Sequence, residues 1–237
     1  MPESFSQRLR RKADAVWEAQ HRHPFVRGIG DGALDLEAFK FWVRQDYLFL
    51  IEYARVLGLA AAKAPDLETM TRFAGLLDET LRVEMGLHRS YAAEFGISEE
   101  ELEREEMAPA TRAYTDFLVR TAAVGDFAEL VAALTPCMWG FCEIAQRLAA
   151  GPQPADAPAR PTSLSGRQAG GRYRRWIEMY SSPEFAELAR WCRDLLDRVA
   201  GGLRGEEQRH LENAFLTSSR YEYLFWEAAY RREGWPV

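Results

Sequence analysis

The sequence predicts an all-α protein folded as one helical bundle, and three observations support this prediction. Apolar residues recur at intervals of three and four along most of the chain, as they do on the buried face of a helix. No segment alternates polar and apolar residues over six positions, as a half-buried strand does. No internal repeat of fixed period divides the chain. A single bundle of helices therefore fits the pattern best.

The long helices are predicted from four apolar stripes, taken in chain order. The stripes run through Phe39, Trp42, Val43, Phe49, Leu50, Tyr53 and Leu57; through Leu67, Met70, Phe73, Leu77, Leu81, Met85 and Tyr91; through Phe127, Leu130, Leu134, Cys137, Phe141, Ile144 and Leu148; and through Leu211, Phe215, Phe225 and Ala229. The first stripe predicts a helix over 36–63. Shorter helices are expected at 5–20, 108–122, 173–180 and 183–200.

Capping and turn residues indicate where these helices begin and end. The glycine-rich segment 28–32 predicts a turn before the next helix, which Asp35 is placed to N-cap. Ser182 followed by Pro183 is typical of an N-cap and the first residue of a helix. The glycine pair at 201–202 predicts the end of the helix that Pro183 begins.

One long irregular stretch, 151–171, is rich in proline, glycine, alanine and serine. It has the composition of a linker between domains. The last predicted helix, however, carries an apolar stripe that needs packing partners from earlier in the chain. We therefore expect a surface loop within one domain that spans 1–237.

Composition and charge exclude several classes of function. The chain has 237 residues, 47% of them hydrophobic and 28% charged, which is typical of a globular protein. A net charge of −6 gains nothing from counterion release, so we expect no nucleic-acid partner. The longest apolar run, 47–51, is too short to span a membrane, and no apolar signal region is present at the N-terminus. Three cysteines without a CxxC pair indicate a cytoplasmic protein.

Polar side chains on the inward faces of four predicted helices are the clearest functional signal. Asp46 lies within the first stripe and Glu222 within the last. Glu84 and His88 lie one turn apart on the second stripe, and Cys137 lies on the third. Each residue also has an ordinary structural explanation. The acids can pair with an arginine or a tyrosine, and His88 can be a core histidine or part of an ion pair. Cys137 can be a small apolar residue. Their convergence on one interior favours a functional site.

The surroundings of the three cysteines differ. Pro136 precedes Cys137 within a helical pattern, and proline removes the backbone donor that would reach residue 132. Such a break is expected to leave donors at the start of the next turn, where they would stabilise a Cys137 thiolate. Cys142 and Cys192 are interpreted as packing residues.

The chain resembles the TenA/thiaminase-II family, and the resemblance runs through nearly its whole length. The segments that carry it are, in order, HPFVRGIGDGALDLEAFKFWVRQDYLFL, EMGLH, YTDFL, GDFAELVAALTPCMWGF, YRRWIEMYSSPEF and SSRYEYLFWEAAY. The resemblance implies a heme-oxygenase-like helical bundle that assembles as a homotetramer. It also implies a hydrolase of thiamin salvage, which cleaves the carbon–nitrogen bond at the aminomethyl carbon of a thiamin-derived pyrimidine and needs no metal or organic cofactor.

The resemblance also implies roles for individual residues. Cys137 in TPCMW matches the family's nucleophile, and Glu222 in YEYLFW matches its acid–base glutamate. Asp46 in RQDY matches the aspartate that binds the aminopyrimidine. Tyr173 in YRRW matches the tyrosine that hydrogen-bonds the glutamate, and Tyr114 in AYTDF matches an aromatic wall of the pocket.

Two positions depart from the better-known bacterial pattern. Phe141, one turn after the nucleophile, and Phe49, three residues after the aspartate, stand where tyrosines are common. Both changes remove a hydroxyl and keep the ring, which leaves open the preferred leaving group and ring substituent. Together with Tyr114 and Tyr47, these rings are expected to bind a flat heteroaromatic substrate by stacking.

The residue types suit this chemistry. A Cys137 thiolate is a soft nucleophile that can add to the pyrimidine ring. Asp46 can hold the amidine-like edge of the ring with two hydrogen bonds. Glu222 lies among aromatic residues that should raise its pKa, so that it can protonate the leaving nitrogen and then activate water.

Two other functions remain open from the sequence. Helical bundles also hold the carboxylate-bridged metal pairs of oxidases, and Glu84 with His88, Glu207 with His210, and Glu143 are possible ligands. The other alternative is a non-catalytic pyrimidine-binding or regulatory protein, since binding can survive the loss of groups that support turnover.

Overall fold

The computed structural model of the protein describes residues 3–151, 171 and 173–237. Every regular element within these residues is helical, so the all-α prediction is confirmed. The elements are α1 (Phe5–Lys12), α2 (Asp14–His21), α3 (Pro24–Asp31), α4 (Leu36–Lys63), α5 (Leu67–Glu79), the π-helical turn η1 (Thr80–Glu84), α6 (Met85–Glu94), α7 (Glu99–Arg104), α8 (Pro109–Val124), α9 (Phe127–Ala150), α11 (Arg174–Tyr180), α12 (Pro183–Ala200) and α13 (Glu206–Arg231).

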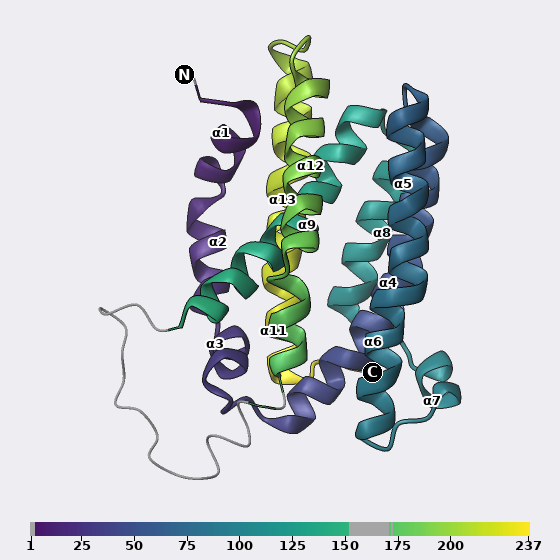
Figure 1. Ribbon diagram of the computed structural model, residues 1–237, viewed down its shortest axis with the longest axis vertical. Helices are drawn as coiled ribbons and strands as arrows, with labels where there is room; N and C mark the ends of the chain where they lie inside the picture. Colours follow the sequence, from purple (N-terminus) through teal and green to yellow (C-terminus); the bar gives the residue numbers. More distant parts are fainter. Residues whose placement is uncertain (1–2, 152–170, 172) are drawn as a thin grey trace.

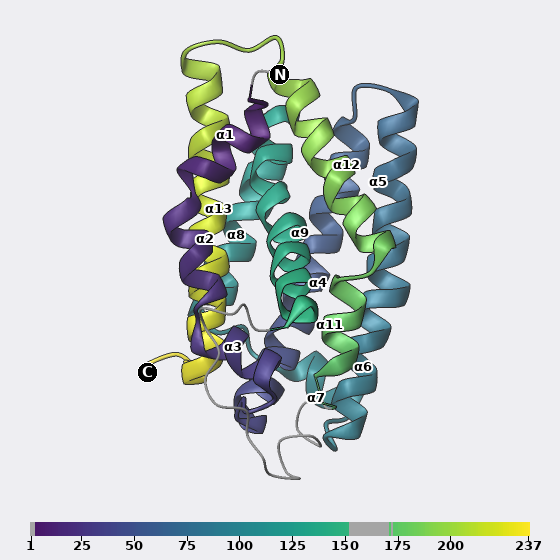
Figure 2. The same cartoon turned by 60° about the vertical axis from the view of Figure 1, so that its left-hand side comes forward.

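Helix α9 lies at the centre of the bundle. It packs against α8, α11, α12 and α13, while α4 packs against α5 and α8 (Figures 1 and 2). Helices α11 to α13 follow the segment 152–170 in the chain and pack directly on α9, which precedes that segment. The apolar stripe of the last predicted helix predicts such packing onto helices from earlier in the chain. Apart from its two end residues, the predicted loop at 151–171 lies outside the described residues.

Helix α9 is also long and apolar enough, by composition alone, to cross a membrane. Within the bundle, however, 72% of its most apolar window is buried. Leu130, Leu134 and Ile144 are among the side chains that other helices cover. A helix that is apolar on nearly all sides is typical of the core of a protein this size as well as of a membrane span.

The caps agree only in part with those predicted. The Ser182 side chain accepts a hydrogen bond from the amide of Phe185, and Pro183 is the first residue of α12, as predicted. Asp35 is the N-cap residue of α4, but its side chain makes no capping hydrogen bond.

Residues 28–31 form the last turn of α3, so the predicted turn over 28–32 is wrong at all but its final residue. Gly32 has a φ of 75° and ends the helix in a conformation that favours glycine. Gly28 serves close packing, because a Cβ atom there would lie 2.9 Å from the Leu34 Cα atom.

The second apolar stripe is interrupted by η1. A π-helical turn adds one residue to the helical turn and changes which side chains of the following helix face inward. Such turns are frequent at functional sites. Here the turn ends at Glu84, which lies against the interior and faces α4 and α11.

Candidate active site

A cavity of about 430 Å³ is lined by residues of α4, α5, η1, α8, α9, α11, α12 and α13. Six of the predicted site residues line it: Asp46, Phe49, Tyr114, Cys137, Phe141 and Glu222. They come from α4, α8, α9 and α13, and each stands on the inward face of its helix. The thiol and the two carboxyl groups expected to perform chemistry therefore share one cavity.

Glu222 is buried, with only 2% of its surface exposed. The Tyr114 hydroxyl donates a hydrogen bond to its Oε1 atom at 2.6 Å and also lies 2.9 Å from Ser218 Oγ. Burial raises the pKa of Glu222 to about 8, although the hydrogen bond from Tyr114 opposes that rise. A carboxyl group of this kind can both give and take a proton near neutral pH.

Cys137 is half-buried, and its thiol is hydrogen-bonded to the carboxylate of Glu222. Helix α9 runs without interruption through Pro136, so no new helix N-terminus begins beside the sulfur. The prediction that backbone donors stabilise a thiolate here is wrong. Burial, together with the charges of Glu222, Glu84 and Asp46, raises the pKa of Cys137 well above its usual value. The resting sulfur is therefore protonated and needs a base before it can act as a nucleophile.

Tyr173 does not make the contact that the resemblance implied. It is buried, and its hydroxyl donates to the backbone carbonyl of Leu34 at 2.9 Å. A hydroxyl has a single proton, so the same group cannot also donate to Glu222. The tyrosine that donates to Glu222 is Tyr114, which is thus more than an aromatic wall.

Tyr47 is likewise buried, but it is not part of the cavity lining. Successive residues of a helix differ by about 100° in direction, so Tyr47 and Asp46 face different surroundings. The guanidinium carbon of Arg89 lies 5.8 Å from the centre of the Tyr47 ring. Phe49 does line the cavity, and its ring centre lies 5.1 Å from that of Tyr114.

Asp46 is held in place by His88. The Nε2 atom of His88 lies 2.6 Å from Asp46 Oδ2, and both side chains are buried. The Nδ1 atom lies 2.9 Å from the backbone carbonyl of Glu84, which only accepts, so Nδ1 carries a proton. Burial alone would lower the pKa of His88, but pairing with Asp46 raises it. One carboxylate oxygen of Asp46 is thus fixed by His88, and the other is left for a ligand.

Glu84, one of the polar residues on the apolar stripes, lines the cavity, and so does Tyr180, which is not predicted from the sequence. The Tyr180 hydroxyl donates to Glu84 Oε1 at 2.7 Å, and burial raises the pKa of Glu84 to about 7. Tyr180 belongs to the segment YRRWIEMYSSPEF, which carries part of the resemblance. That segment holds two tyrosines, and nothing in their spacing shows which of them faces the cavity.

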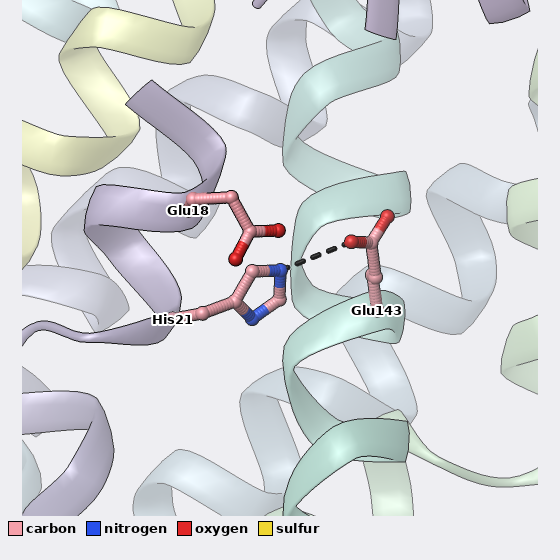
Figure 3. A group of neighbouring side chains, drawn as sticks. All are labelled: Glu18, His21 and Glu143. Carbon is pink, nitrogen blue, oxygen red and sulfur yellow. Dashed lines mark hydrogen bonds and ion pairs between the residues drawn. The ribbon is translucent and has the colours of Figure 1, made fainter. Parts of the chain in front are cut away.

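A second group of ionisable side chains lies where α2 meets α9. Ligand atoms of Glu18, His21 and Glu143 lie within 4.8 Å of one another (Figure 3). Arg10 and Arg147 each donate to Glu143 at 2.8 Å. Burial alone would raise the pKa of Glu143, but hydrogen bonds from His21 and Arg10 lower it to about 2. The group is a salt-bridge network that joins α1 and α2 to α9, and its arginines already neutralise the acids a cation would need.

The glutamate–histidine pairs expected of a metal-dependent oxidase do not meet. Glu207 and His210 are exposed near the start of α13, and Glu143 belongs to the salt-bridge network. Among the described residues, the cavity lining contains carboxylates but no histidine. His88 approaches the cavity only through its contact with Asp46.

The chain is similar over nearly its whole length to proteins of one family. The sequence model described as TENA/THI-4/PQQC family matches residues 10–232. The aminopyrimidine aminohydrolase of Halalkalibacterium halodurans is 45% identical over 232 residues, which cover 98% of each chain. A solved TenA homologue from P. horikoshii OT3 has a TM-score of 0.81 and 28% identity, over 96% of this chain and 99% of its own. A domain from Shewanella denitrificans, described as having a heme oxygenase-like fold, is similar in fold alone, with a TM-score of 0.71 and 13% identity over 95% of this chain and 91% of its own.

Proposed function

The chain belongs to the TENA/THI-4/PQQC family, and from this we propose that it is a hydrolase of the aminopyrimidine aminohydrolase, or thiaminase II, type. Its substrate is a thiamin-derived pyrimidine, and the bond it cleaves is the carbon–nitrogen bond at the aminomethyl carbon. The observation that carries this proposal is the meeting of Cys137, Glu222 and Asp46 in one cavity. The 45% identical relative with that activity in its name supports it.

Binding begins with the pyrimidine edge. The oxygen of Asp46 that His88 does not hold accepts hydrogen bonds from the amino group and the protonated ring nitrogen. The negative charge of Asp46 favours protonation of the ring, which makes the ring carbons more electrophilic. Phe49 and Phe141 provide apolar faces for the ring, each stacking contact contributing about 0.5–1.5 kcal/mol.

The first chemical step joins Cys137 to the ring. The carboxylate of Glu222 takes the thiol proton as the sulfur adds to a ring carbon. The same proton then passes from Glu222 to the leaving nitrogen, and the carbon–nitrogen bond breaks to release ammonia. The remaining adduct has an exocyclic carbon–carbon double bond at the former methylene.

Water completes the reaction. Glu222, again a carboxylate, takes a proton from water as its oxygen adds to the methylene carbon. The carbon–sulfur bond then breaks, the ring regains its aromaticity, and the sulfur recovers the proton from Glu222. The products are a hydroxymethylpyrimidine and ammonia, and no step requires a metal or organic cofactor.

We further propose that the enzyme is cytoplasmic and acts as a homotetramer whose subunits each form one domain over 1–237. Apolar side chains on the outside of α5 and η1 support assembly into an oligomer. Leu67 and Met70, one turn apart on α5, are 77% and 41% exposed in the isolated chain, and Leu81 is 46% exposed. Burial of such side chains against another subunit removes apolar surface from water.

Turnover by the wild-type protein tests the proposed function. The purified protein is incubated with the aminomethylpyrimidine, and ammonia and the hydroxymethyl product are measured together. We expect equal amounts of the two products and multiple turnovers. Tight binding of the pyrimidine without any release of ammonia over hours would instead support the non-catalytic alternative.

The role assigned to Tyr114 predicts a shift in pH dependence. Because Glu222 must be a carboxylate to take the thiol proton, we expect kcat/KM to rise with pH through about 8. The substitution Tyr114→Phe removes a hydrogen bond that stabilises the carboxylate, so this rise should move to higher pH. A shift of one pH unit lowers kcat/KM at pH 7 about 10-fold.

Tyr173→Phe is the matched control for Tyr114→Phe. Its hydroxyl donates to Leu34, so this variant should keep the wild-type pH profile and lose only thermal stability. A displaced profile in Tyr173→Phe, with a wild-type profile in Tyr114→Phe, would contradict the assignment.

A further inference from the structure

Tyr53 has a buried hydroxyl without a hydrogen-bond partner in the protein, and it lines the cavity. Only 3% of its surface is exposed. Among the described residues that line the cavity, no other side chain has a buried polar atom without a hydrogen-bond partner. The other two tyrosines of the cavity have partners, since Tyr114 donates to Glu222 and Tyr180 to Glu84.

The position of Tyr53 separates it from the pyrimidine-binding end of the cavity. It follows Asp46 by seven residues on α4, which is two helical turns and about 10 Å along the axis. Its ring stacks on that of Phe49, with 5.6 Å between ring centres and 21° between planes. Burial raises the pKa of Tyr53, and after burial the largest effect is that of Cys137. The hydroxyl therefore stands at the Cys137 end.

An unpaired buried hydroxyl destabilises the folded chain, because the group loses its hydrogen bonds to water and gains none. Substitution by phenylalanine would keep the ring packing on Phe49 and remove that cost. Folding alone therefore gives no reason for a hydroxyl group at position 53, whereas a ligand that hydrogen-bonds this hydroxyl does.

We propose that Tyr53 is a specificity-determining residue whose hydroxyl binds the leaving nitrogen of the substrate and selects an amine over a thiazolium. This inference rests on the proposed function. It assigns the hydroxyl to the half of the substrate that Asp46 does not hold.

The chemistry of the two leaving groups supports this selection. A primary amine has both N–H donors and a lone pair, so it satisfies the hydroxyl whether the hydroxyl donates or accepts. A thiazolium nitrogen has neither an N–H group nor a free lone pair. Binding thiamin would leave the Tyr53 hydroxyl unpaired, and sites with a buried polar group discriminate strongly against ligands that cannot pair with it.

The test compares two substrates in wild type and Tyr53→Phe. For the aminomethylpyrimidine, kcat/KM is expected to fall about 10- to 100-fold, while for thiamin it should change less than about 3-fold. The ratio of the two values should therefore fall at least several-fold. If thiamin turnover is undetectable, the inhibition constant of thiamin, measured with the amine substrate, replaces the kcat/KM of thiamin in the comparison. An unchanged ratio would overturn the proposal.

Stability distinguishes a ligand-binding role from a structural one. The melting temperature of Tyr53→Phe should equal or exceed that of wild type. Tyr91→Phe is the matched control, because Tyr91 is equally buried, lies outside the cavity lining and accepts a hydrogen bond from the Trp176 amide. That variant should melt at a lower temperature and keep the wild-type ratio of kcat/KM values. A melting temperature lowered in Tyr53→Phe as much as in Tyr91→Phe would also overturn the proposal.

The proposed function and this inference fail in different ways. An absence of ammonia release by the wild-type protein would remove the proposed function. Ammonia release by the wild type, with the same substrate ratio in Tyr53→Phe, would remove only the role of Tyr53.

Discussion

Replacing Cys137 with serine is expected to lower kcat for the aminomethylpyrimidine by at least about 10³-fold, with little change in the Kd of the pyrimidine. A serine hydroxyl is a harder and far less acidic nucleophile than a thiol, so Glu222 cannot take its proton efficiently. Asp46 and the aromatic residues that we propose bind the ring are unchanged in this variant. Ammonia release gives kcat, and calorimetric titration gives Kd.

Cys142→Ser is the matched control for this substitution. Cys142 is also on α9 and buried, but it does not line the cavity. The control variant should retain the kcat of wild type even if it is somewhat less stable. Full activity in Cys137→Ser would remove the thiol from the mechanism.

Replacing Glu222 with glutamine is expected to lower kcat about 10²- to 10⁴-fold. Glutamine has nearly the same size but can neither take the thiol proton nor deliver one to the leaving nitrogen. The residual activity should also lose the rise of kcat/KM with pH through about 8, because the group that titrates there is gone. A pH profile from 6 to about 9.5 measures both effects.

The stability of Glu222→Gln shows whether the lost activity reflects lost chemistry or lost folding. The folded protein keeps a proton on Glu222 up to about pH 8, whereas an unfolded chain releases it near the ordinary glutamate pKa of 4.5. Stability of the wild type therefore falls as pH rises between these values. The variant has no such dependence, so its free energy of unfolding relative to wild type should increase over that pH range.

Glu206→Gln is the control for the charge change, because Glu206 is exposed at the start of α13. It should match wild type in kcat and in the pH dependence of stability. Wild-type kcat in Glu222→Gln would show that another group performs the proton transfers.

The apolar periodicity of the chain predicts the long helices, and most residues of the first, third and fourth stripes are buried. In the second stripe, Leu67, Met70 and Leu81 are exposed. Asp46, Cys137 and Glu222 were recognised because an acid or a thiol on an apolar stripe interrupts the pattern. All three line the same cavity. Periodicity shows toward which side of its helix each side chain points. Side chains that point inward from several packed helices meet in the same interior.

Hydrogen-bond partners were harder to predict than positions. Tyr173 and Tyr114 are both buried and inward-facing, but only the second reaches Glu222. Which tyrosine reaches the carboxylate depends on how far each helix is shifted along its neighbours. That shift is a property of the packed bundle and leaves no trace in the spacing of one helix.

Local irregularities account for the remaining differences. The π-helical turn η1 changes the register after Leu77, and a pattern search that assumes one period cannot detect it. Gly28 belongs to the glycine-rich segment that predicts a turn, but it lies inside α3, where Leu34 packs against its backbone. Neither feature can be predicted from local composition or from a single helical period.

The raised pKa of Cys137 has a consequence for the durability of the protein. Peroxides attack thiolates and leave neutral sulfhydryls largely intact. In the proposed mechanism Cys137 gives its proton to Glu222 only as the sulfur adds to a bound pyrimidine, so a free thiolate would be short-lived. We therefore expect peroxide to oxidise Cys137 slowly while the cavity is empty.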